Sequence, residues 1–361
     1  MLFNLAELQN ECSRLFKLRP DETLKVVQEL YEKKLVTYPR TDARVLSTAV
    51  AKEIYKNISG LRGFAPVSDF AKEVLEMGSY KNIAKTRYVN DKQITDHYAI
   101  VPTGQGLGAL KSVSRMGFSV YTVIAKRFLS IFYPAAEYQK INLTVTKDKE
   151  HFFVSFKVLL SEGYLKVAGK PADKSKEGEE NEKIDKGFLE LLKTLKKGIS
   201  LPIKELYIKE GETTPPKRYN SGSMILAMEN AGQLIEDEEL RAMIKGSGIG
   251  TSATRAEILK KLVTIKYLAL NKKTQIITPT KLGEMVYDVV DSSLRALLNP
   301  ELTASWEKGL NYVAEGTITP KEYMEKLDNF VSVRTEYVKR LNNQWMLREK
   351  YEAISENYIK N

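Results

Sequence analysis

Apolar residues recur every three or four positions through the first part of the chain, which is the spacing of helices that bury one face. Two helices are predicted between residues 5 and 35, with Pro20 at the start of the second, because proline suits the first turn of a helix. Ser47 is placed to cap a third helix, and helical spacing returns at residues 121–133. The chain up to residue 139 is therefore predicted to be mainly helical.

The pattern then changes to alternating apolar and polar residues. Residues 141–160 (INLTVTKDKEHFFVSFKVLL) are rich in Val, Phe and Thr, and they predict two antiparallel strands joined by a turn at 147–150. A second β-like segment, ISLPIKELYIKEG, follows at 199–211. Between these segments, residues 168–187 are charged and hold no aromatic residue, so we expect a flexible, solvated loop there.

Helical spacing returns from residue 219 and is followed by a hairpin. The order is typical of a winged helix, a common DNA-reading module. Ser221 is the predicted cap of the first helix and Gly232 its stop. The predicted segments are SGSMILAMENAG (221–232), EDEELRAMIKGSG (236–248), TSATRAEILKKLV (251–263) and the hairpin YLALNKKTQIITPT (267–280), turning at 271–273.

The C-terminal part begins with a capping box. Thr319 and Glu322 flank Pro320 at the first helical position, which predicts one long helix reaching to about Glu356. The fold class that these patterns predict is multidomain and mainly α, with a smaller antiparallel β portion.

Composition narrows the choice of partner. The 361 residues are 43% hydrophobic and 28% charged, as in soluble globular proteins, and the formal net charge is +10 with a sequence pI of about 9.2. A basic balance favours a polyanion such as nucleic acid, or an acidic membrane face, as the partner.

No apolar run reaches the roughly 18 residues of a membrane span, and no signal peptide is visible, so we expect a cytoplasmic protein. The single cysteine, Cys12, excludes an internal disulfide and a cysteine-based zinc site.

One short segment, TYPRTD, has the chemistry of a nucleophile site. A tyrosine has a pKa near ~10 and attacks poorly unless positive charge stabilises its phenolate. Arg40 lies two residues after Tyr38, and Pro39 favours extended backbone before it. In extended geometry Tyr38, Arg40 and Asp42 would share one surface. The alternative is a tyrosine packed in an ordinary turn.

A second segment, TDHYAIVPTGQG (95–106), contains one of the two histidines of the chain. His97 follows Asp96, which could orient the imidazole, and a protonated ring could donate to a phosphate oxygen. The alternative is a loop histidine held by its neighbours.

A third segment, GSGIGTSATR (246–255), is a glycine-punctuated loop that runs into a helix. Backbone N–H groups at a helix N-terminus, together with Ser252, Thr254 and Arg255, would form a phosphate cradle. The segment lacks the Gly-Lys-Ser/Thr of a P-loop, and an ordinary glycine turn is the alternative.

Basic and aromatic residues mix in PPKRYNSG (215–222). Lys217, Arg218 and Tyr219 are the types that bind single-stranded nucleic acid, although a plain linker is the alternative. The acidic run at 236–239 fits a helix start better than a metal site. We therefore assign no metal-binding residues in this chain.

Together these segments resemble one family. TYPRTD, DHYAIVPT, PPKRYNSGSMILAMENAG and GIGTSATRAEIL, in this order, resemble the signature segments of type IA DNA topoisomerases, in particular the topoisomerase III-like branch. ITPTKLGEMV and NPELTASWEKGL resemble later segments of that family. The resemblance runs from about Phe3 to about Asn343.

The resemblance implies a reaction and roles for the residues. The tyrosine at position 38 would attack one strand and form a 5′-phosphotyrosyl link, another strand would pass, and the break would be resealed without ATP. Arg40 would hold the scissile phosphate and help to activate Tyr38. His97 would stabilise the same phosphate and Asp42 would position the site. Thr254 and Arg255 would bind the single strand in a separate groove.

The resemblance also implies a division into domains. Residues 3–139 would form the gate domain that carries Tyr38, and 140–216 part of a β arch that includes the loop at 168–187. Residues 217–361 would form a base domain with the winged-helix-like segment and the long C-terminal helix.

One part of the family pattern is missing. The family places a Toprim domain, with an Asp-x-Asp-x-Glu cluster that holds Mg²⁺, before these segments, and this chain has no Asp-x-Asp. We therefore expect a central fragment whose partner is the Toprim domain of the same full-length polypeptide. The chain alone is expected to bind single-stranded DNA and to leave the reaction incomplete, because acid–base help and the metal are supplied elsewhere.

Three other functions explain fewer of these motifs. A non-enzymatic winged-helix DNA-binding protein explains residues 219–280 but not TYPRTD. A site-specific recombinase needs arginines and a histidine upstream of a late tyrosine, whereas Tyr38 comes early. A scaffolding role explains none of the motifs.

Overall fold

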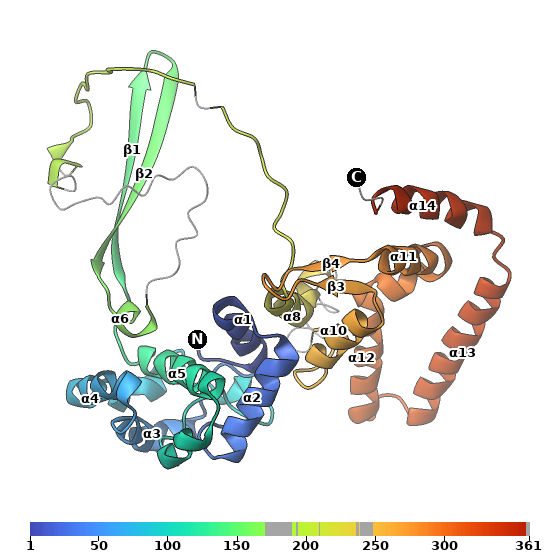
Figure 1. Ribbon diagram of the computed structural model, residues 1–361, viewed down its shortest axis with the longest axis horizontal. Coiled ribbons are helices and arrows are strands. Elements are labelled where there is room, and N and C mark those ends of the chain that lie inside the picture. The colour runs from blue at the N-terminus through green and yellow to red at the C-terminus, as the bar shows by residue number, and fades with distance from the viewer. Residues whose placement is uncertain (170–189, 193, 209, 236–237, 239–247, 359–361) are drawn as a thin grey trace.

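The computed structural model describes residues 1–169, 190–192, 194–208, 210–235, 238 and 248–358. It contains an N-terminal helical domain, a long two-stranded ribbon and a C-terminal helical domain (Figure 1). The predicted fold class is confirmed, because the described residues are mainly helical and their strands form two small antiparallel sheets. None of the described helices has both the length and the apolar character needed to cross a bilayer.

The N-terminal helical domain consists of five α-helices and four short 3₁₀ helices around one apolar core. Its core residues run from Leu2 to Phe132, with Val167 added from a later turn, and Cys12 is fully buried among them. Ser47 caps its helix as predicted, with its hydroxyl accepting from the N–H of Val50 at 3.2 Å. The elements are α1 (Leu5–Phe16), α2 (Pro20–Glu32), α3 (Thr48–Leu61), η1 (Ala65–Val67), α4 (Ser68–Met77), η2 (Ser79–Lys85), η3 (Asp91–Gln93), η4 (Leu107–Ser112) and α5 (Arg115–Ser130).

The predicted hairpin is confirmed as a ribbon that projects from this domain (Figure 1). Strands β1 (Glu137–Lys147) and β2 (Glu150–Ser161) pair antiparallel, and Lys147 pairs with Glu150 across a two-residue turn. Asp148 in that turn has φ 55°, which the left-handed geometry of tight hairpins requires. After the ribbon, α6 (Leu165–Ala168) returns to α5.

The prediction of a strand at residues 199–211 is wrong. The described residues of this segment form no strand, and they run as an exposed, extended connection toward the C-terminal domain (Figure 1). A strand needs a neighbouring edge for its backbone hydrogen bonds, and β1 and β2 pair only with each other. Most of the loop predicted at 168–187, and most of the helix predicted at 236–248, lie outside the described residues.

The C-terminal helical domain has a small apolar core. Ile225, Leu259 and Ile277 form this core together with Ala6 of α1, so the first helix of the chain belongs to both domains. The elements are α8 (Ser221–Glu229), η5 (Ala231–Leu234), α10 (Arg255–Thr264), β3 (Leu268–Leu270), β4 (Ile277–Pro279), α11 (Lys281–Leu294), η6 (Arg295–Leu298), α12 (Pro300–Ala314), α13 (Pro320–Lys339) and α14 (Gln344–Glu356). The predicted hairpin between residues 267 and 280 is present as β3 and β4.

The predicted cap of α8 is displaced by one residue. Asn220 is the cap, and its side chain accepts from the N–H of Ser223 at 2.8 Å. The hydroxyl of Ser221 is buried instead, 3.1 Å from the hydroxyl of Ser13 on α1 and 2.9 Å from Oε1 of Gln275. Ser221 therefore helps to join the two domains.

The prediction of a single long C-terminal helix is also wrong. The capping box of Thr319 and Glu322 is present, but α13 ends at Lys339 and a separate helix, α14, begins at Gln344. The side chain of Asn343 in this break donates to the carbonyl of Ser292 on α11 at 3.0 Å. Packing of α14 against α11 thus turns the chain at a point where local helix propensity is low.

Candidate active site and its interface

The two predicted motifs around Tyr38 and His97 lie side by side. Residues 35–41 run antiparallel to residues 97–103, with a bridge between Val36 and Pro102. The N–H of Thr37 donates to the carbonyl of Val101 at 3.0 Å, and the hydroxyl of Thr37 donates to the carbonyl of Ala99 at 2.9 Å. This pairing brings together two motifs that are about 60 residues apart in the sequence.

Tyr38 lies between two other rings. Its ring centroid is 4.3 Å from that of His97, at an interplanar angle of 42°, and 5.4 Å from that of Tyr31, which meets it edge-on. Tyr38 is half-buried and His97 is exposed, so the pair lies at the surface of the N-terminal domain. The structure therefore places the predicted nucleophile within contact of the predicted phosphate-binding imidazole.

His97 is held through its backbone. Its carbonyl accepts from the hydroxyl of Thr41 at 2.7 Å, which links the His97 segment to TYPRTD. Among the described residues, no hydrogen bond joins Asp96 to the His97 ring, so Asp96 does not orient it as expected.

Arg40 is exposed, and no described residue forms a hydrogen bond or ion pair with it. The N–H of Thr41 donates to the carbonyl of Pro39 at 3.1 Å, which makes a tight three-residue turn centred on Arg40. This turn interrupts the regular extended backbone on which the shared surface of Tyr38, Arg40 and Asp42 depended. The sharing of one surface by Tyr38, Arg40 and Asp42 therefore stays a prediction.

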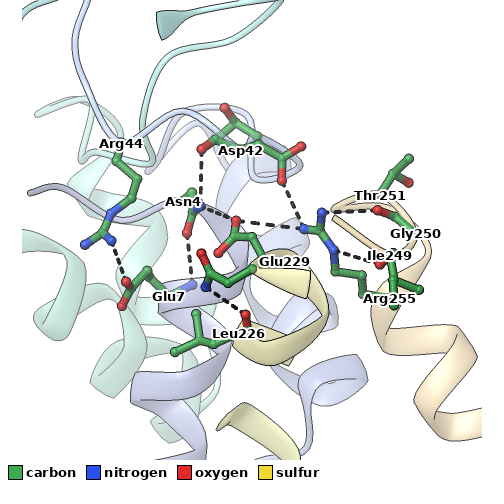
Figure 2. Close-up of polar contacts among 12 residues, drawn as sticks. Asn4, Glu7, Asp42, Arg44, Leu226, Glu229, Ile249, Gly250, Thr251 and Arg255 are labelled. Atoms are coloured by element: carbon green, nitrogen blue, oxygen red, sulfur yellow. Dashed lines mark hydrogen bonds and ion pairs between the residues drawn. The ribbon is translucent and has the colours of Figure 1, made fainter. Parts of the chain in front are cut away.

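Asp42 reaches across to the C-terminal domain instead. Its Oδ1 lies 3.1 Å from Nη1 of Arg255, the first residue of α10 (Figure 2). Arg255 also lies 3.8 Å from Oε1 of Glu229 at the end of α8. The tyrosine segment is thus tied by charge to a helix more than 200 positions away.

The loop before α10 wraps the guanidinium of Arg255. The carbonyl of Ile249 accepts from Nε at 3.3 Å and the carbonyl of Gly250 accepts from Nη2 at 3.1 Å (Figure 2). Only 1% of the Arg255 side chain is exposed. In this conformation the guanidinium does not face an open groove, so its expected contact with a DNA strand needs a different conformation.

Glu229 is the acidic residue that the motif analysis missed. Its Oε1 accepts from Nδ2 of Asn4 at 2.7 Å, and the same Nδ2 donates to the carbonyl of Asp42 at 3.2 Å. Burial raises the pKa of Glu229, and the nearby charge of Asp42 raises it further, while Arg255 lowers it. One signal was present in the sequence, since Glu229 is the only charged residue of an otherwise uncharged helix.

The other predicted DNA-binding residues lie on the surface of the C-terminal domain or just before it. Lys217 and Arg218 are exposed in the segment that leads into α8. Thr254 is exposed and its hydroxyl accepts from the N–H of Thr251 at 2.9 Å, while Ser252 is half-buried. These four residues are accessible to a ligand in this conformation, unlike Arg255.

The described residues do not fit a resident metal ion. No three or more His, Cys, Asp or Glu side chains among them converge on a point that could hold one. The carboxylate of Asp42, in the tyrosine segment, is directed toward Arg255, and that of Glu229 accepts from Asn4. No step of the chemistry is therefore assigned to a metal held by these residues.

Comparison with known proteins decides the family. A family model described as DNA topoisomerase matches residues 1–325. The chain belongs to the type IA DNA topoisomerase family. It is 32% identical over 348 residues to DNA topoisomerase 3 of Bacillus licheniformis and 33% identical over 344 residues to DNA topoisomerase 3 of Bacillus subtilis. These matches cover 95% and 94% of this topoisomerase chain, which spans 45% of each relative.

A solved structure has the same fold. Full-length topoisomerase I from Thermotoga maritima superimposes with a TM-score of 0.59 at 20% identity, over 94% of this topoisomerase chain and 50% of the other. The topoisomerase III-like resemblance of the motifs therefore agrees with the sequence relatives, and the solved structure shows the shared fold.

Proposed function

We propose that this chain carries the strand-cleaving tyrosine of a type IA topoisomerase and that Tyr38 is the nucleophile. The contact between the Tyr38 and His97 rings is the observation that carries this proposal. The phenol and the imidazole lie together, and the exposed Arg40 follows two residues after Tyr38, which supports the binding of one phosphodiester by these three residues. A DNA-binding winged helix without catalysis leaves this arrangement unexplained.

The chemistry would be a transesterification. The Tyr38 oxygen attacks the phosphorus and the bond to the 3′ oxygen breaks, so the phosphate stays on Tyr38 and a 3′ hydroxyl leaves. Arg40 and His97 would bind the non-bridging oxygens, on which negative charge builds up. The reverse attack by the 3′ hydroxyl reseals the strand, and because one phosphoester replaces another, no ATP is consumed. Passage of a second strand between these steps would give relaxation or decatenation.

Single-stranded DNA is the proposed partner. Lys217 and Arg218 would contact phosphates, and Thr254 and Ser252 would add hydrogen bonds near the start of α10. Arg255 would join them only after it leaves Asp42. Asp42 itself would position the tyrosine segment and not touch the strand.

The remaining parts of the reaction are assigned to segments outside this chain. The chain spans 45% of the Bacillus licheniformis relative, and the family resemblance places Mg²⁺ in a Toprim domain. We propose that such a domain of the same polypeptide supplies the metal and the proton for the leaving 3′ hydroxyl. Since the relatives are bacterial, the same proposal places the protein in the cytoplasm.

The test uses the full-length protein and a single-stranded oligonucleotide labelled at either end. A 5′-phosphotyrosyl link predicts that the 3′-labelled fragment travels with the denatured protein and that Tyr38→Phe abolishes this adduct. An adduct that carries the 5′ label, or one that survives Tyr38→Phe, would contradict the proposal.

This chain alone is tested separately. It should bind a single-stranded oligonucleotide more tightly than a duplex of the same length, as measured by fluorescence anisotropy. It should not relax supercoiled plasmid when Mg²⁺ is present. Magnesium-dependent relaxation by this polypeptide would overturn the assignment of the metal to another domain.

A further inference from the structure

A cluster of charged and polar side chains joins the two helical domains at the tyrosine segment. It consists of Asn4, Asp42, Glu229 and Arg255, and we call it the interdomain latch (Figure 2). Asn4 and Asp42 belong to the N-terminal domain, while Glu229 and Arg255 end α8 and begin α10. Every contact named here between the two pairs crosses the domain interface.

We propose that Arg255 is a positioning residue: it clamps Asp42, and with it the segment that carries Tyr38, onto the C-terminal domain while the two domains are closed. The inference builds on the proposed function, because strand passage requires these domains to separate. The latch then makes the placement of the nucleophile depend on closure.

The geometry favours a clamp over a passive surface pair. The Arg255 side chain is 1% exposed, and two loop carbonyls hold its guanidinium so that Nη1 points at Asp42. An ion pair with such a preorganised, desolvated partner contributes more than one between two mobile surface chains. Asp42 is 39% exposed and lies only four residues after Tyr38, so it can be released without disturbing the core.

Other contacts across the interface fix how α1 packs against the C-terminal domain. Ala6 of α1 is part of the C-terminal core, and Ser13 bonds with Ser221 across the interface. Apolar and hydroxyl contacts of this kind dock the helices but do not reach the tyrosine segment. Asp42 is the residue of TYPRTD whose side chain forms an ion pair across the interface, so breaking that pair frees the segment specifically.

A second interdomain pair offers a matched control. Nζ of Lys260, also on α10, lies 4.0 Å from Oδ2 of Asp21 on α2. The Lys260 side chain is 48% exposed, and an exposed pair at this distance contributes little. Lys260→Gln removes one positive charge from the same helix as Arg255→Gln does, without touching the latch.

The experiment measures the distance between the domains in this chain without DNA. Spin labels are attached to Lys52→Cys on α3 and Glu315→Cys after α12, both at exposed positions. The native thiol does not interfere, because burial raises the pKa of Cys12 to about 12 and leaves it 0% exposed. Distances are read by pulsed electron spin resonance.

Asp42→Asn and Arg255→Gln should each raise the ratio of the long-distance to the short-distance population about tenfold or more, as loss of a charged hydrogen bond predicts. The double variant should open no further than the single ones, because both remove the same interaction. Lys260→Gln should leave the distribution within about twofold of the unchanged protein. Arg255→Lys, which keeps the charge but loses the planar fork, should give partial rescue.

Two results would overturn the proposal. One is an unchanged distribution in Asp42→Asn, a variant that leaves the buried Arg255 and its carbonyl contacts in place and so tests the latch even if Arg255→Gln misfolds. The other is equal opening by Lys260→Gln. Because no cleavage is measured, failure of the nucleophile assignment at Tyr38 would leave this test unaffected.

Discussion

Gly222 of α8 lies directly against Asn10 of α1. A Cβ placed on Gly222 would lie 2.6 Å from the Cα of Asn10 and 2.9 Å from the Cβ of Ser13. Real Cβ atoms do not approach backbone so closely, so only glycine permits this separation of the two helices. The closeness of the two domains is therefore set by one missing side chain.

Gly222→Ala is expected to push α1 and α8 apart. Overpacking of this kind costs about 1–3 kcal/mol, and it should appear as a lower midpoint of urea unfolding and a longer interdomain distance. Gly108→Ala is the control, because a Cβ there meets nothing within 4 Å. Equal stability of the two variants would mean that α1 and α8 are not closed in solution.

Tyr38→Phe should remove catalysis without weakening the fold. No described residue forms a hydrogen bond with the Tyr38 hydroxyl, and the phenyl ring keeps its contacts with Tyr31 and His97. We expect the thermal midpoint to stay within about 1 °C, since substitutions that break no such feature stay within ~0.5 kcal/mol. Calorimetry of the chain checks this, and the adduct assay of the full-length protein should show complete loss. A clear drop in the midpoint would indicate a structural role for the hydroxyl.

Arg40→Ala should weaken binding of single-stranded DNA in a salt-dependent way. Loss of one phosphate contact lowers the slope of log affinity against log salt concentration by about 0.7 for a single strand. Anisotropy titrations at several salt concentrations measure that slope. Arg348→Ala, which removes the same charge from exposed α14, should leave it unchanged. An equal effect of both variants would show that only net charge matters.

Closure of the interface should depend on pH through Glu229. Burial raises its pKa above the usual glutamic acid range in the closed state, and separation of the domains would return the pKa to that range. Closing therefore takes up a proton at Glu229. The stabilisation of the closed state by this proton is complete below the usual pKa of glutamic acid, and it is lost as the pH rises through the raised pKa of Glu229 in the closed state. The groups around Glu229 are Arg255, which lowers its pKa, and Asp42 and Glu7, which raise it.

The measurement is the interdomain distance in the spin-labelled chain between pH 7.5 and pH 5. The closed population should grow as the pH falls. Glu229→Gln, which cannot ionise, should remove that dependence and still accept the hydrogen bond from Asn4. A dependence that persists in Glu229→Gln would assign it to another group.

Local sequence was sufficient for most of the helices, for the ribbon and for the motif around Tyr38. Helical periodicity, the caps at Ser47 and Thr319 and the alternation in residues 141–160 all act over a few residues, where a side chain and the backbone beside it decide the conformation. The sequence predicted that Tyr38 and His97 act on the same phosphate, but it did not predict their contact. No local pattern pairs residues 35–41 with residues 97–103.

The positions of Arg255 and Glu229 were decided by tertiary structure. Read along the chain, Arg255 belongs to a basic, hydroxyl-rich loop suited to phosphate, whereas docking of α1 on α8 places Asp42 beside it and removes it from water. The same holds for the break between α13 and α14, which depends on packing against α11, and for residues 199–211, which lack a neighbouring strand. In each case the deciding partner lies dozens to hundreds of residues away, beyond the reach of any periodic pattern.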